Sequence, residues 1–307
     1  MMHRVAILMA TYNGAAYLEE QLASLLSQSC RWIDVVVSDD GSEDGTLDIL
    51  MEWKEKWTKG RFLVREGPGR GFAENFRSLI VDPAIDADYY AFCDQDDIWE
   101  PQKLELAVSR LGGVPAGSPA LFCSRTLTIT ESGKAVGMSP LFSKEPSFRN
   151  ALVQSLAGGN TMVLNRAAQS IMKRASLRSG FISHDWWAYL LVSGAGGQVF
   201  YCTRPLVRYR QHGSNQVGAN TSMRARFSRL RRMIRGQFWE WSSENISGLE
   251  ANADILTEEA RQTLDRFRKA RSAAWPSGIF YLRRSRVYRQ TFSGNAGLYL
   301  ALLIRRL

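Results

Sequence analysis

Residues 5–10 read Val-Ala-Ile-Leu-Met-Ala, an unbroken apolar run that is followed at once by the polar Thr11-Tyr12-Asn13-Gly14. A run that is apolar on both alternating faces predicts a strand buried on both sides of a sheet. Sheets of that kind consist of parallel strands covered by helices. The abrupt change predicts that the strand ends near Thr11, with polar side chains at its carboxyl end.

The same alternation continues along the chain. Strands are predicted over residues 33–38, 62–64 and 89–93, and helices over residues 17–28, 46–57 and 73–80. Strands that alternate with helices predict an α/β fold with a mostly parallel central sheet. Further strands are predicted over residues 120–130, 158–164 and 199–210, the last interrupted at Pro205, and a further helix over residues 186–192.

The charge balance changes near residue 220, where we place a domain boundary between residues 1–220 and 221–307. The first part carries 22 Lys and Arg against 23 Asp and Glu, and the second carries 17 against 7. Helices predicted over residues 223–241 and 249–273 combine Arg with Phe, Leu, Ile and Trp. This pattern is typical of helices that lie on an anionic membrane surface. A helical appendage packed on the first domain and a homo-oligomer surface are the alternatives.

Cysteine usage and hydropathy exclude several classes of protein. Cys30, Cys93, Cys123 and Cys202 form no CxxC pair and no Cys/His cluster, which argues against zinc and indicates free thiols in a reducing cytosol. No run approaches the roughly 20 apolar residues of a membrane-spanning helix, and the first run is too short for a secretory signal. We therefore expect a cytoplasmic protein, held peripherally on the inner face of the cytoplasmic membrane.

Three predicted strands end in polar residues. These are Thr11-Tyr12-Asn13, Asp39-Asp40-Gly41-Ser42 and Asp94-Gln95-Asp96-Asp97. Ligands of open parallel sheets bind at the carboxyl ends of the strands. Carboxylates gathered there repel one another without a cation, and their oxygens suit Mg²⁺ or Mn²⁺ bridging to phosphates. The simplest substrate of such a site is a nucleoside diphosphate derivative.

Each motif taken alone has a plainer interpretation. Asp39-Asp40-Gly41-Ser42 also fits a turn before a helix cap, and Asp94-Gln95-Asp96-Asp97 a solvated loop. The run at residues 67–71, Gly-Pro-Gly-Arg-Gly, fits a phosphate cradle of backbone amides or a structural turn. The order and spacing of the motifs together carry the functional interpretation.

Taken in order, the motifs resemble those of family 2 glycosyltransferases with a GT-A fold. The resemblance covers roughly residues 4–220. It rests on ATYNG at residues 10–14, SDDGS at 38–42, DQDDIW at 94–99, SHDWW at 183–187 and YRQHGSN at 209–215. The third and last of these look most like the rhamnosyltransferase branch. The resemblance implies a GT-A catalytic domain, to which the C-terminal helices form an appendage.

The implied reaction is a metal-dependent, inverting transfer of a sugar. The donor would be a dTDP or UDP sugar, such as dTDP-rhamnose, and the acceptor a glycan or lipid-linked glycan of cell-surface polysaccharide such as O-antigen. The resemblance assigns nucleotide contacts to Thr11, Asn13, Asp39, Arg70, Asn75, Asp94, Gln95 and Arg210. Asp39 would accept a hydrogen bond from the pyrimidine N3–H, and Asp94 would lie near the ribose.

The remaining roles concern metal, base and acceptor. Asp96, Asp94 and His212 are the implied ligands of Mg²⁺ or Mn²⁺. Asp185 is the implied catalytic base, because an acceptor hydroxyl attacks well only when a carboxylate removes its proton; the plainer interpretation of Asp185 is a helix cap. The implied acceptor-side residues are Gly159, Asn160, Trp186 and Trp187.

Other functions fit the sequence less well. A sugar nucleotidylyltransferase usually opens with a Gly-rich loop that carries Arg and Lys, which Thr11-Tyr12-Asn13-Gly14 lacks. A nucleic-acid-binding protein would leave the acidic motifs without a purpose, so we expect no nucleic acid partner. A dinucleotide-dependent oxidoreductase would need GxGxxG after the first strand.

Overall fold

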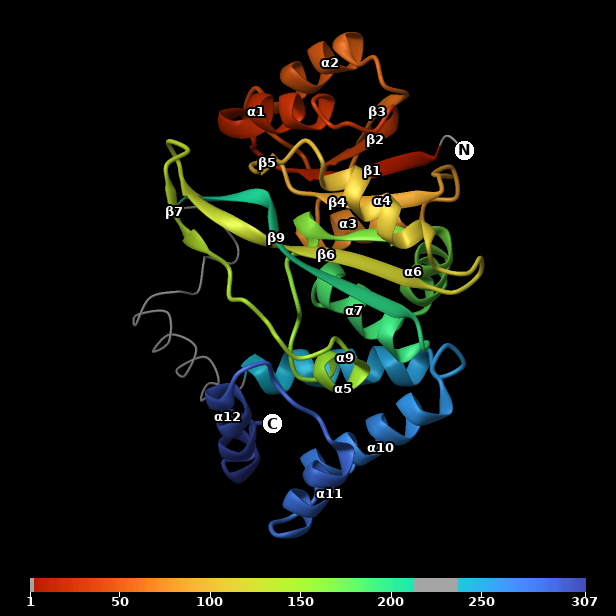
Figure 1. The fold of residues 1–307 in the computed structure, drawn as a ribbon, viewed down its shortest axis with the longest axis vertical. Helices are drawn as coiled ribbons and strands as arrows, with labels where there is room; N and C mark the ends of the chain where they lie inside the picture. Colours follow the sequence, from red (N-terminus) through yellow and green to blue (C-terminus); the bar gives the residue numbers. More distant parts are fainter. Residues whose placement is uncertain (1–2, 213–236) are drawn as a thin grey trace.

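The structure is a computed structural model and describes residues 3–212 and 237–307. The described strands are β1 (Arg4–Thr11), β2 (Trp32–Asp39), β3 (Phe62–Glu66), β4 (Tyr89–Cys93), β5 (Ile98–Trp99), β6 (Ala120–Thr130), β7 (Ala135–Met138), β8 (Val163–Asn165) and β9 (Gln198–Gln211). They form one sheet in the order β3-β2-β1-β4-β8-β6-β9-β5, and β7 pairs with β6 outside this path. The curled sheet lies across the upper and middle part of the molecule (Figure 1).

Helices cover both faces of the sheet. Those of the first two thirds of the chain are α1 (Ala15–Leu26), α2 (Thr46–Lys56), α3 (Phe72–Val81), α4 (Lys103–Gly112), α5 (Phe148–Ala151), α6 (Arg166–Arg178) and α7 (His184–Gly194), together with the short 3₁₀ helix η1 (Gly159–Thr161). The helices of residues 237–307 are α9 (Gln237–Ala251), α10 (Glu258–Ser272), α11 (Ser277–Ser285) and α12 (Phe292–Leu303).

The strand predicted from residues 5–10 lies at the centre of the fold, as expected. β1 pairs in parallel with both β2 and β4, and β2 pairs in parallel with β3. Val5, Ile7 and Met9 pack with α1, α2 and α4, and Ala6 and Leu8 pack on the other face with α3, α6 and α7. Burial on both faces explains why the run contains no polar residue.

The second half of the sheet mixes directions. β8 is antiparallel to β4 and β6, β5 is antiparallel to β9, and β6 and β9 are parallel to each other. β9 continues through Pro205 as a single strand, with register shifts against β6 at Ser124/Arg125 and Arg125/Thr126. Proline cannot donate to a strand ladder, so a bulge at this point accommodates it.

Two sequence predictions are wrong in detail. Residues 158–164 are not one strand, because the chain forms η1 before β8 begins at Val163. Residues 249–273 are not one helix either. α9 ends at Ala251, and α10 begins only after Thr257, whose side chain caps it by accepting a hydrogen bond from the N–H of Ala260.

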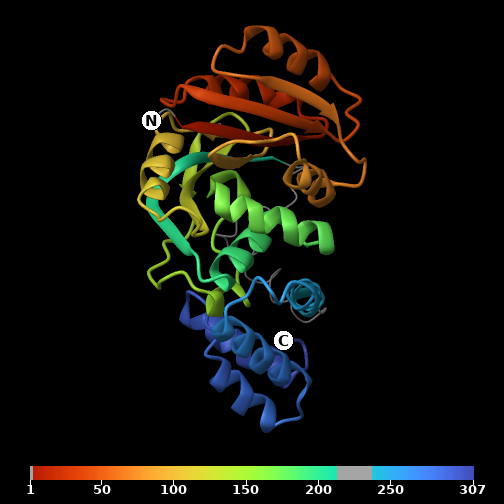
Figure 2. The ribbon, with the colours of Figure 1, turned by 90° about the vertical axis from the view of Figure 1, so that its right-hand side faces the viewer.

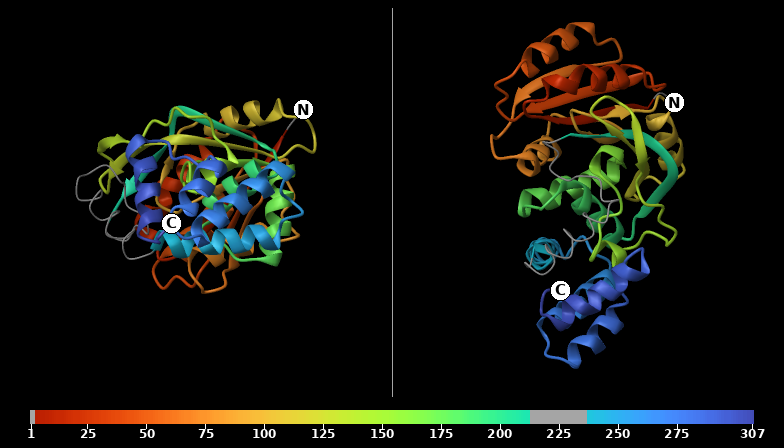
Figure 3. Two further views of the ribbon diagram at one scale, coloured as in Figure 1. Left: turned by 90° about the horizontal axis from the view of Figure 1, so that it is seen from below. Right: turned by 90° about the vertical axis from the view of Figure 1, so that its left-hand side faces the viewer.

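The C-terminal helices form the end of the molecule opposite α2 (Figures 2 and 3). α9 and α10 pack on the body, since Leu249, Leu264 and Phe267 belong to the same apolar cluster as Trp187 of α7. The predicted boundary near residue 220 and residues 223–236 of the predicted basic helix lie outside the described residues. Within the described residues, no helix combines the length and the apolar character needed to span a bilayer.

Candidate functional site

The carboxyl ends of β1 and β2 are joined around Asp39, which is 3% exposed. Its carboxylate accepts hydrogen bonds from Thr11 Oγ1 (2.7 Å), Ser42 Oγ (2.7 Å) and the N–H groups of Ser42 (2.8 Å) and Gly41 (3.2 Å). Asn13 joins the same loop, because its Oδ1 accepts from the N–H of Glu43 at 2.8 Å. The structure therefore brings together three of the predicted nucleotide contacts, Thr11, Asn13 and Asp39.

The glycine-rich run at residues 67–71 is tied to the same end of the sheet by a carboxylate. Asp40 accepts hydrogen bonds from the N–H of Gly69 (2.7 Å) and the N–H of Gly71 (2.8 Å). Both glycines have positive φ values that other residues rarely adopt. Because Asp40 occupies these two amides, the structural turn is the correct interpretation of them. Arg70 lies exposed between the two glycines, so its role as a donor contact stays a prediction.

Asn75 of α3 is buried and does not line a surface. Its Nδ2 donates to the backbone oxygen of Ser38 (2.9 Å) and, more weakly, to that of Thr11 (3.5 Å). The side chain points into the gap between the ends of β1 and β2, and its role as a nucleotide contact stays a prediction. Asn75 thus holds the carboxyl ends of β1 and β2 in register.

Gln95 connects the acidic motif to the first motif. Its Oε1 accepts from the N–H of Tyr12 at 2.7 Å, and its Nε2 donates to the oxygen of Tyr12 at 2.9 Å. Gly14 permits this approach, because a Cβ built on it would lie 2.4 Å from the Gln95 side chain. The amide thus fixes the loop after β4 against the loop after β1.

The three aspartates of the acidic motif have different surroundings. Asp97 is fully buried, accepts from Asn160 Nδ2 and accepts from the N–H of Arg210 at 3.1 Å. Asp96 is partly exposed, and its Oδ2 lies 2.6 Å from Nε2 of His212. Burial, followed by the charges of Asp96 and Asp185, raises the pKa of Asp94 to about 7. Asp94 is therefore close to both the predicted metal ligand and the predicted base.

Arg210 has a different role from the one predicted. The residue is buried; its Nε donates to the oxygen of Asp96 at 3.1 Å, and its other guanidinium nitrogens donate to the backbone of Glu131 and the carboxylate of Glu20. The guanidinium is held against the acidic motif in this structure, and the donor contact stays a prediction. Arg210 positions that motif.

The predicted metal ligands are only partly brought together. Asp96 and His212 are in contact, and Asp94 interacts electrostatically with Asp96. Across residues 3–212 and 237–307, no group of three or more His, Cys, Asp or Glu side chains is arranged to hold a metal ion. The three-ligand set therefore stays a prediction.

Asp185 lies in the first turn of α7 and is partly exposed. Its Oδ1 accepts from the N–H of Trp186 at 2.7 Å, so it does contribute to the helix start. The helix N-terminus favours its negative charge, and its interaction with Asp94 places the carboxylate beside the acidic motif. The predicted base and the predicted donor motif thus share one region of the surface.

The structure buries all four predicted acceptor-side residues, and their contact with an acceptor stays a prediction. Trp187 is 0% exposed and packs against Gly248 of α9, and Trp186 is buried with its Nε1 donating to Ala151. Neither ring has a free face for a sugar. Gly159 and Asn160 are also buried. The side-chain amide of Asn160 donates a hydrogen bond to the carboxylate of Asp97 and so helps to hold the acidic motif.

His184 is a residue that the sequence interpretation missed. It is buried between Phe76 and Phe92, with ring centroids 3.7 Å and 4.7 Å away, and neither ring nitrogen has a hydrogen-bond partner among the residues that the structure describes. Its Nε2 would lie only 1.9 Å from a Cβ built on Gly159. His184 therefore fixes the start of α7, and with it Asp185, against η1.

Burial lowers the pKa of His184 from 6.5 to about 4. Between these two values the imidazole of the unfolded chain binds a proton that the native imidazole does not. His184 therefore costs no stability above about pH 6.5, and it lowers the free energy of unfolding as the pH drops toward 4. We expect His184→Leu to lose about 3 kcal/mol less unfolding free energy than wild type when the pH is lowered from 7 to 4. Urea unfolding of both proteins at the two pH values measures this difference. Equal pH slopes in the two proteins would contradict the buried neutral imidazole.

Three more residues around the motif carry no sequence signal of their own. Tyr17 of α1 stacks on His212 with centroids 4.9 Å apart, and Glu20 of the same helix holds Arg210. Their spacing of about one helical turn puts Tyr17 and Glu20 on one face of α1. Lys103 is fully buried with Nζ 2.9 Å from the Trp99 ring centroid, and burial holds the pKa of its amine well below the usual range.

Comparison with known proteins agrees with the motifs. The model of glycosyl transferase family 2 matches residues 6–167. The dTDP-rhamnosyl transferase RfbG of Shigella flexneri is 28% identical over 258 residues, which make up 82% of this chain and 87% of that protein. An uncharacterized glycosyltransferase of Rickettsia typhi is 26% identical over 228 residues, 71% of this chain and 67% of that protein. The predicted family resemblance is confirmed.

Solved structures confirm the predicted GT-A fold. TarS 1–349 of S. aureus, in complex with UDP-GlcNAc, superimposes with a TM-score of 0.55 at 15% identity, over 92% of this chain and 88% of that chain. The mannosyltransferase PcManGT of Pyrobaculum calidifontis, in complex with GDP-Man and Mn²⁺, gives 0.51 at 17% identity, over 99% and 86%. At these identities the likeness concerns the fold.

Proposed function

Because the chain belongs to glycosyl transferase family 2, we propose that it transfers a deoxysugar, rhamnose in the first instance, from a nucleoside diphosphate donor to a glycan or lipid-linked glycan acceptor. The proposed donor is dTDP-rhamnose, since the S. flexneri relative is named a dTDP-rhamnosyl transferase. The proposed product belongs to cell-surface polysaccharide such as O-antigen.

One observation carries the proposal: the charges of Asp96 and Asp185 both raise the pKa of Asp94, after burial. Asp94 and Asp96 follow β4, whereas Asp185 begins α7, so two distant segments place carboxylates in one region. A transferase needs this arrangement, with one group at the departing diphosphate and another at the attacking hydroxyl.

A divalent cation fits the first of these groups. Asp94 and Asp96 offer carboxylate oxygens, and His212 offers Nε2 beside Asp96. After burial, repulsion from the Asp96 carboxylate raises the pKa of Asp94. A bound cation would offset that repulsion. When bound, Mg²⁺ or Mn²⁺ would supply charge neutralisation at the leaving diphosphate.

Asp185 is the proposed base. It would accept the proton of the acceptor hydroxyl as that oxygen attacks the anomeric carbon opposite the departing nucleoside diphosphate, which inverts the anomeric centre. Its partial exposure leaves the carboxylate accessible to an acceptor, and the contact of its Oδ1 with the α7 backbone fixes its orientation.

We further propose a peripheral position on the inner face of the cytoplasmic membrane. Large apolar side chains are exposed on the C-terminal helices, including Phe280 (55%) on α11 and Phe292 (90%) on α12. Exposed aromatic and aliphatic side chains next to Arg are typical of helices that lie in a bilayer interface. A lipid-linked acceptor would be reached from such a position.

The donor site is tested by a thermal-shift screen of nucleoside diphosphates and their sugars, with and without Mn²⁺. A ligand at about 100 times its Kd raises the free energy of unfolding by about 2.7 kcal/mol, a shift of about 5 °C or more for a chain of this size. We expect a metal-dependent shift with dTDP or dTDP-rhamnose that Asp96→Ala abolishes.

The matched control is Glu55→Ala on the exposed face of α2, which should keep the full shift. A screen in which no nucleotide stabilises the wild-type protein would contradict the donor site. A shift of equal size without Mn²⁺, or in Asp96→Ala, would contradict the metal ligand while leaving the nucleotide site standing.

A further inference from the structure

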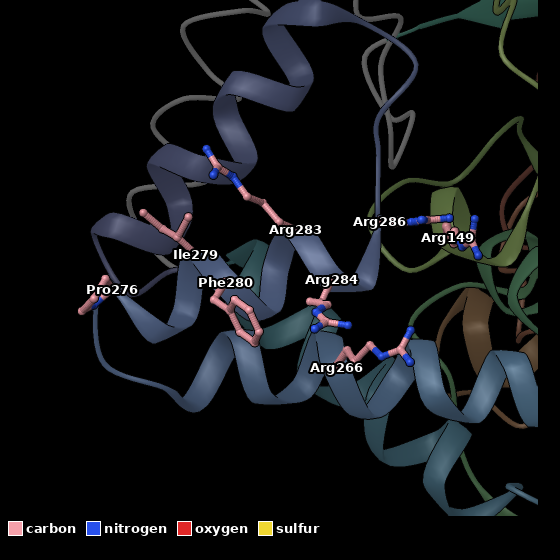
Figure 4. Close-up of a pocket in the computed structure, with 8 residues that line it drawn as sticks. All are labelled: Arg149, Arg266, Pro276, Ile279, Phe280, Arg283, Arg284 and Arg286. Carbon is pink, nitrogen blue, oxygen red and sulfur yellow. The ribbon is translucent and has the colours of Figure 1, made fainter.

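An arginine-lined pocket of about 600 Å³ lies between α5, α10 and α11, in the part of the molecule that faces away from α2 (Figures 1 and 4). Five guanidinium groups line it, from Arg149, Arg266, Arg283, Arg284 and Arg286. They come from three separated segments of the chain, so the fold gathers them. Neither the family nor the proposed reaction accounts for this pocket.

The pocket has little negative charge of its own. Arg149 pairs with Glu259 at 2.7 Å, and Arg266 donates to the neutral Gln262. Over the described residues, Arg266, Arg283, Arg284 and Arg286 form no ion pair with a carboxylate within 4.0 Å. Like charges held in one concavity repel one another, and an anion would relieve that repulsion. Guanidinium groups also match phosphate oxygens with paired hydrogen bonds.

Apolar side chains also line the pocket, from Pro276, Ile279 and Phe280. The guanidinium carbon of Arg284 lies 5.3 Å from the ring centroid of Phe280, and Trp275, next to Pro276 in the chain, is 67% exposed. Further exposed apolar residues are Phe292, Leu300 and Leu303 on α12 and Ile304, which follows the helix. A soluble phosphate needs no such surroundings, whereas a phosphate at a bilayer surface lies next to acyl chains.

We propose that this pocket binds the phosphate group of an anionic membrane lipid, with the exposed aromatic and aliphatic side chains of α11 and α12 inserted beside it. The proposal rests on the peripheral membrane position suggested above and gives it a defined contact. It assigns the headgroup to the described helices α10 and α11 and to α5, which packs on the helix that carries Asp185. A bound lipid would thus fix the catalytic body at a constant orientation to the membrane.

The test is co-sedimentation of the full chain with vesicles of phosphatidylcholine, alone or mixed with phosphatidylglycerol. Each Arg near an anionic surface contributes roughly fivefold to binding, so Arg266→Gln/Arg284→Gln should weaken binding to the mixed vesicles by about 30-fold. The matched control is Lys54→Gln/Lys56→Gln, which removes the same charge from the exposed face of α2 at the opposite end of the molecule and should stay within about threefold of wild type. Far-ultraviolet circular dichroism of both variants is the check that they are folded.

Several results would overturn the proposal. Equal losses in the two variants would indicate diffuse charge, and equal wild-type binding to both vesicle types would exclude an anionic headgroup. Stabilisation by inorganic phosphate without preference for phosphatidylglycerol would mean a soluble ligand, and displacement from vesicles by a DNA duplex at a lower phosphate concentration would mean a nucleic acid. The nucleotide thermal shift is a separate measurement, so a failed donor site and a failed lipid site remain distinguishable.

Discussion

Asp185→Asn is expected to lower kcat for sugar transfer by about 100-fold to 10,000-fold, the usual contribution of a general base. Asparagine keeps the size of the side chain and an Oδ1 that accepts from the N–H of Trp186, so the start of α7 is preserved. What it loses is the ability to take a proton from the acceptor hydroxyl. The measurement is the steady-state rate of transfer from the proposed donor dTDP-rhamnose, monitored through the release of dTDP.

Two comparisons separate this chemical role from a structural one. Asp48→Asn makes the same change at an exposed position in the first turn of α2 and should leave transfer unchanged. The nucleotide thermal shift of Asp185→Asn should match that of wild type, because the residue is assigned to the acceptor side. Transfer within tenfold of wild type would exclude Asp185 as the base, and a lost nucleotide shift would reassign it to the donor site.

The fold was predictable where local pattern decides the structure. Residues 5–10 must be buried on both faces, and the structure has β1 there between two parallel neighbours. The polar residues after β1, β2 and β4 were predicted to meet because parallel strands end at the same edge, and the hydrogen bonds of Thr11 with Asp39 and of Tyr12 with Gln95 agree. These inferences need only periodicity and strand direction.

The features that the sequence did not predict depend on contacts between distant residues. Residues 158–164 have the composition of a strand, yet η1 forms because Gly159 packs against the ring of His184. Arg210 has the character of a phosphate ligand, but Glu20 on α1 binds its guanidinium. Trp187 is next to a site residue in sequence, and the helical turn directs it into the core. No local signal distinguishes a buried member of a motif from an exposed one.

Gly159→Ala is expected to be among the most damaging single changes away from the reacting groups. A Cβ at this position would lie 1.9 Å from His184 Nε2, and the ring cannot retreat because Phe76 and Phe92 pack against it. Overpacking of this kind typically costs about 1–3 kcal/mol of unfolding free energy. Gly180→Ala is the matched control, since among the described residues, its two chain neighbours aside, no atom lies within 4 Å of its Cβ position.

The effect on catalysis should exceed the effect on stability. Gly159 belongs to η1, whose Asn160 holds Asp97 of the acidic motif, and His184 begins the helix that carries Asp185. A forced separation of η1 from α7 would change the distance between the acidic motif and Asp185, the proposed donor and acceptor groups. Small misplacements of reacting groups cost large factors in rate. We therefore expect kcat to fall at a temperature where Gly159→Ala is still fully folded.

A double-mutant cycle decides whether this contact is the cause. His184→Ala alone leaves a cavity and destabilises the protein, but it also removes the ring that the new methyl group meets. The Gly159→Ala/His184→Ala protein should therefore be more stable than the sum of the single changes predicts, by about 1 kcal/mol or more. Additive free energies of unfolding would show that the two residues do not press on each other, and the link between η1 and α7 would then have to run through other contacts.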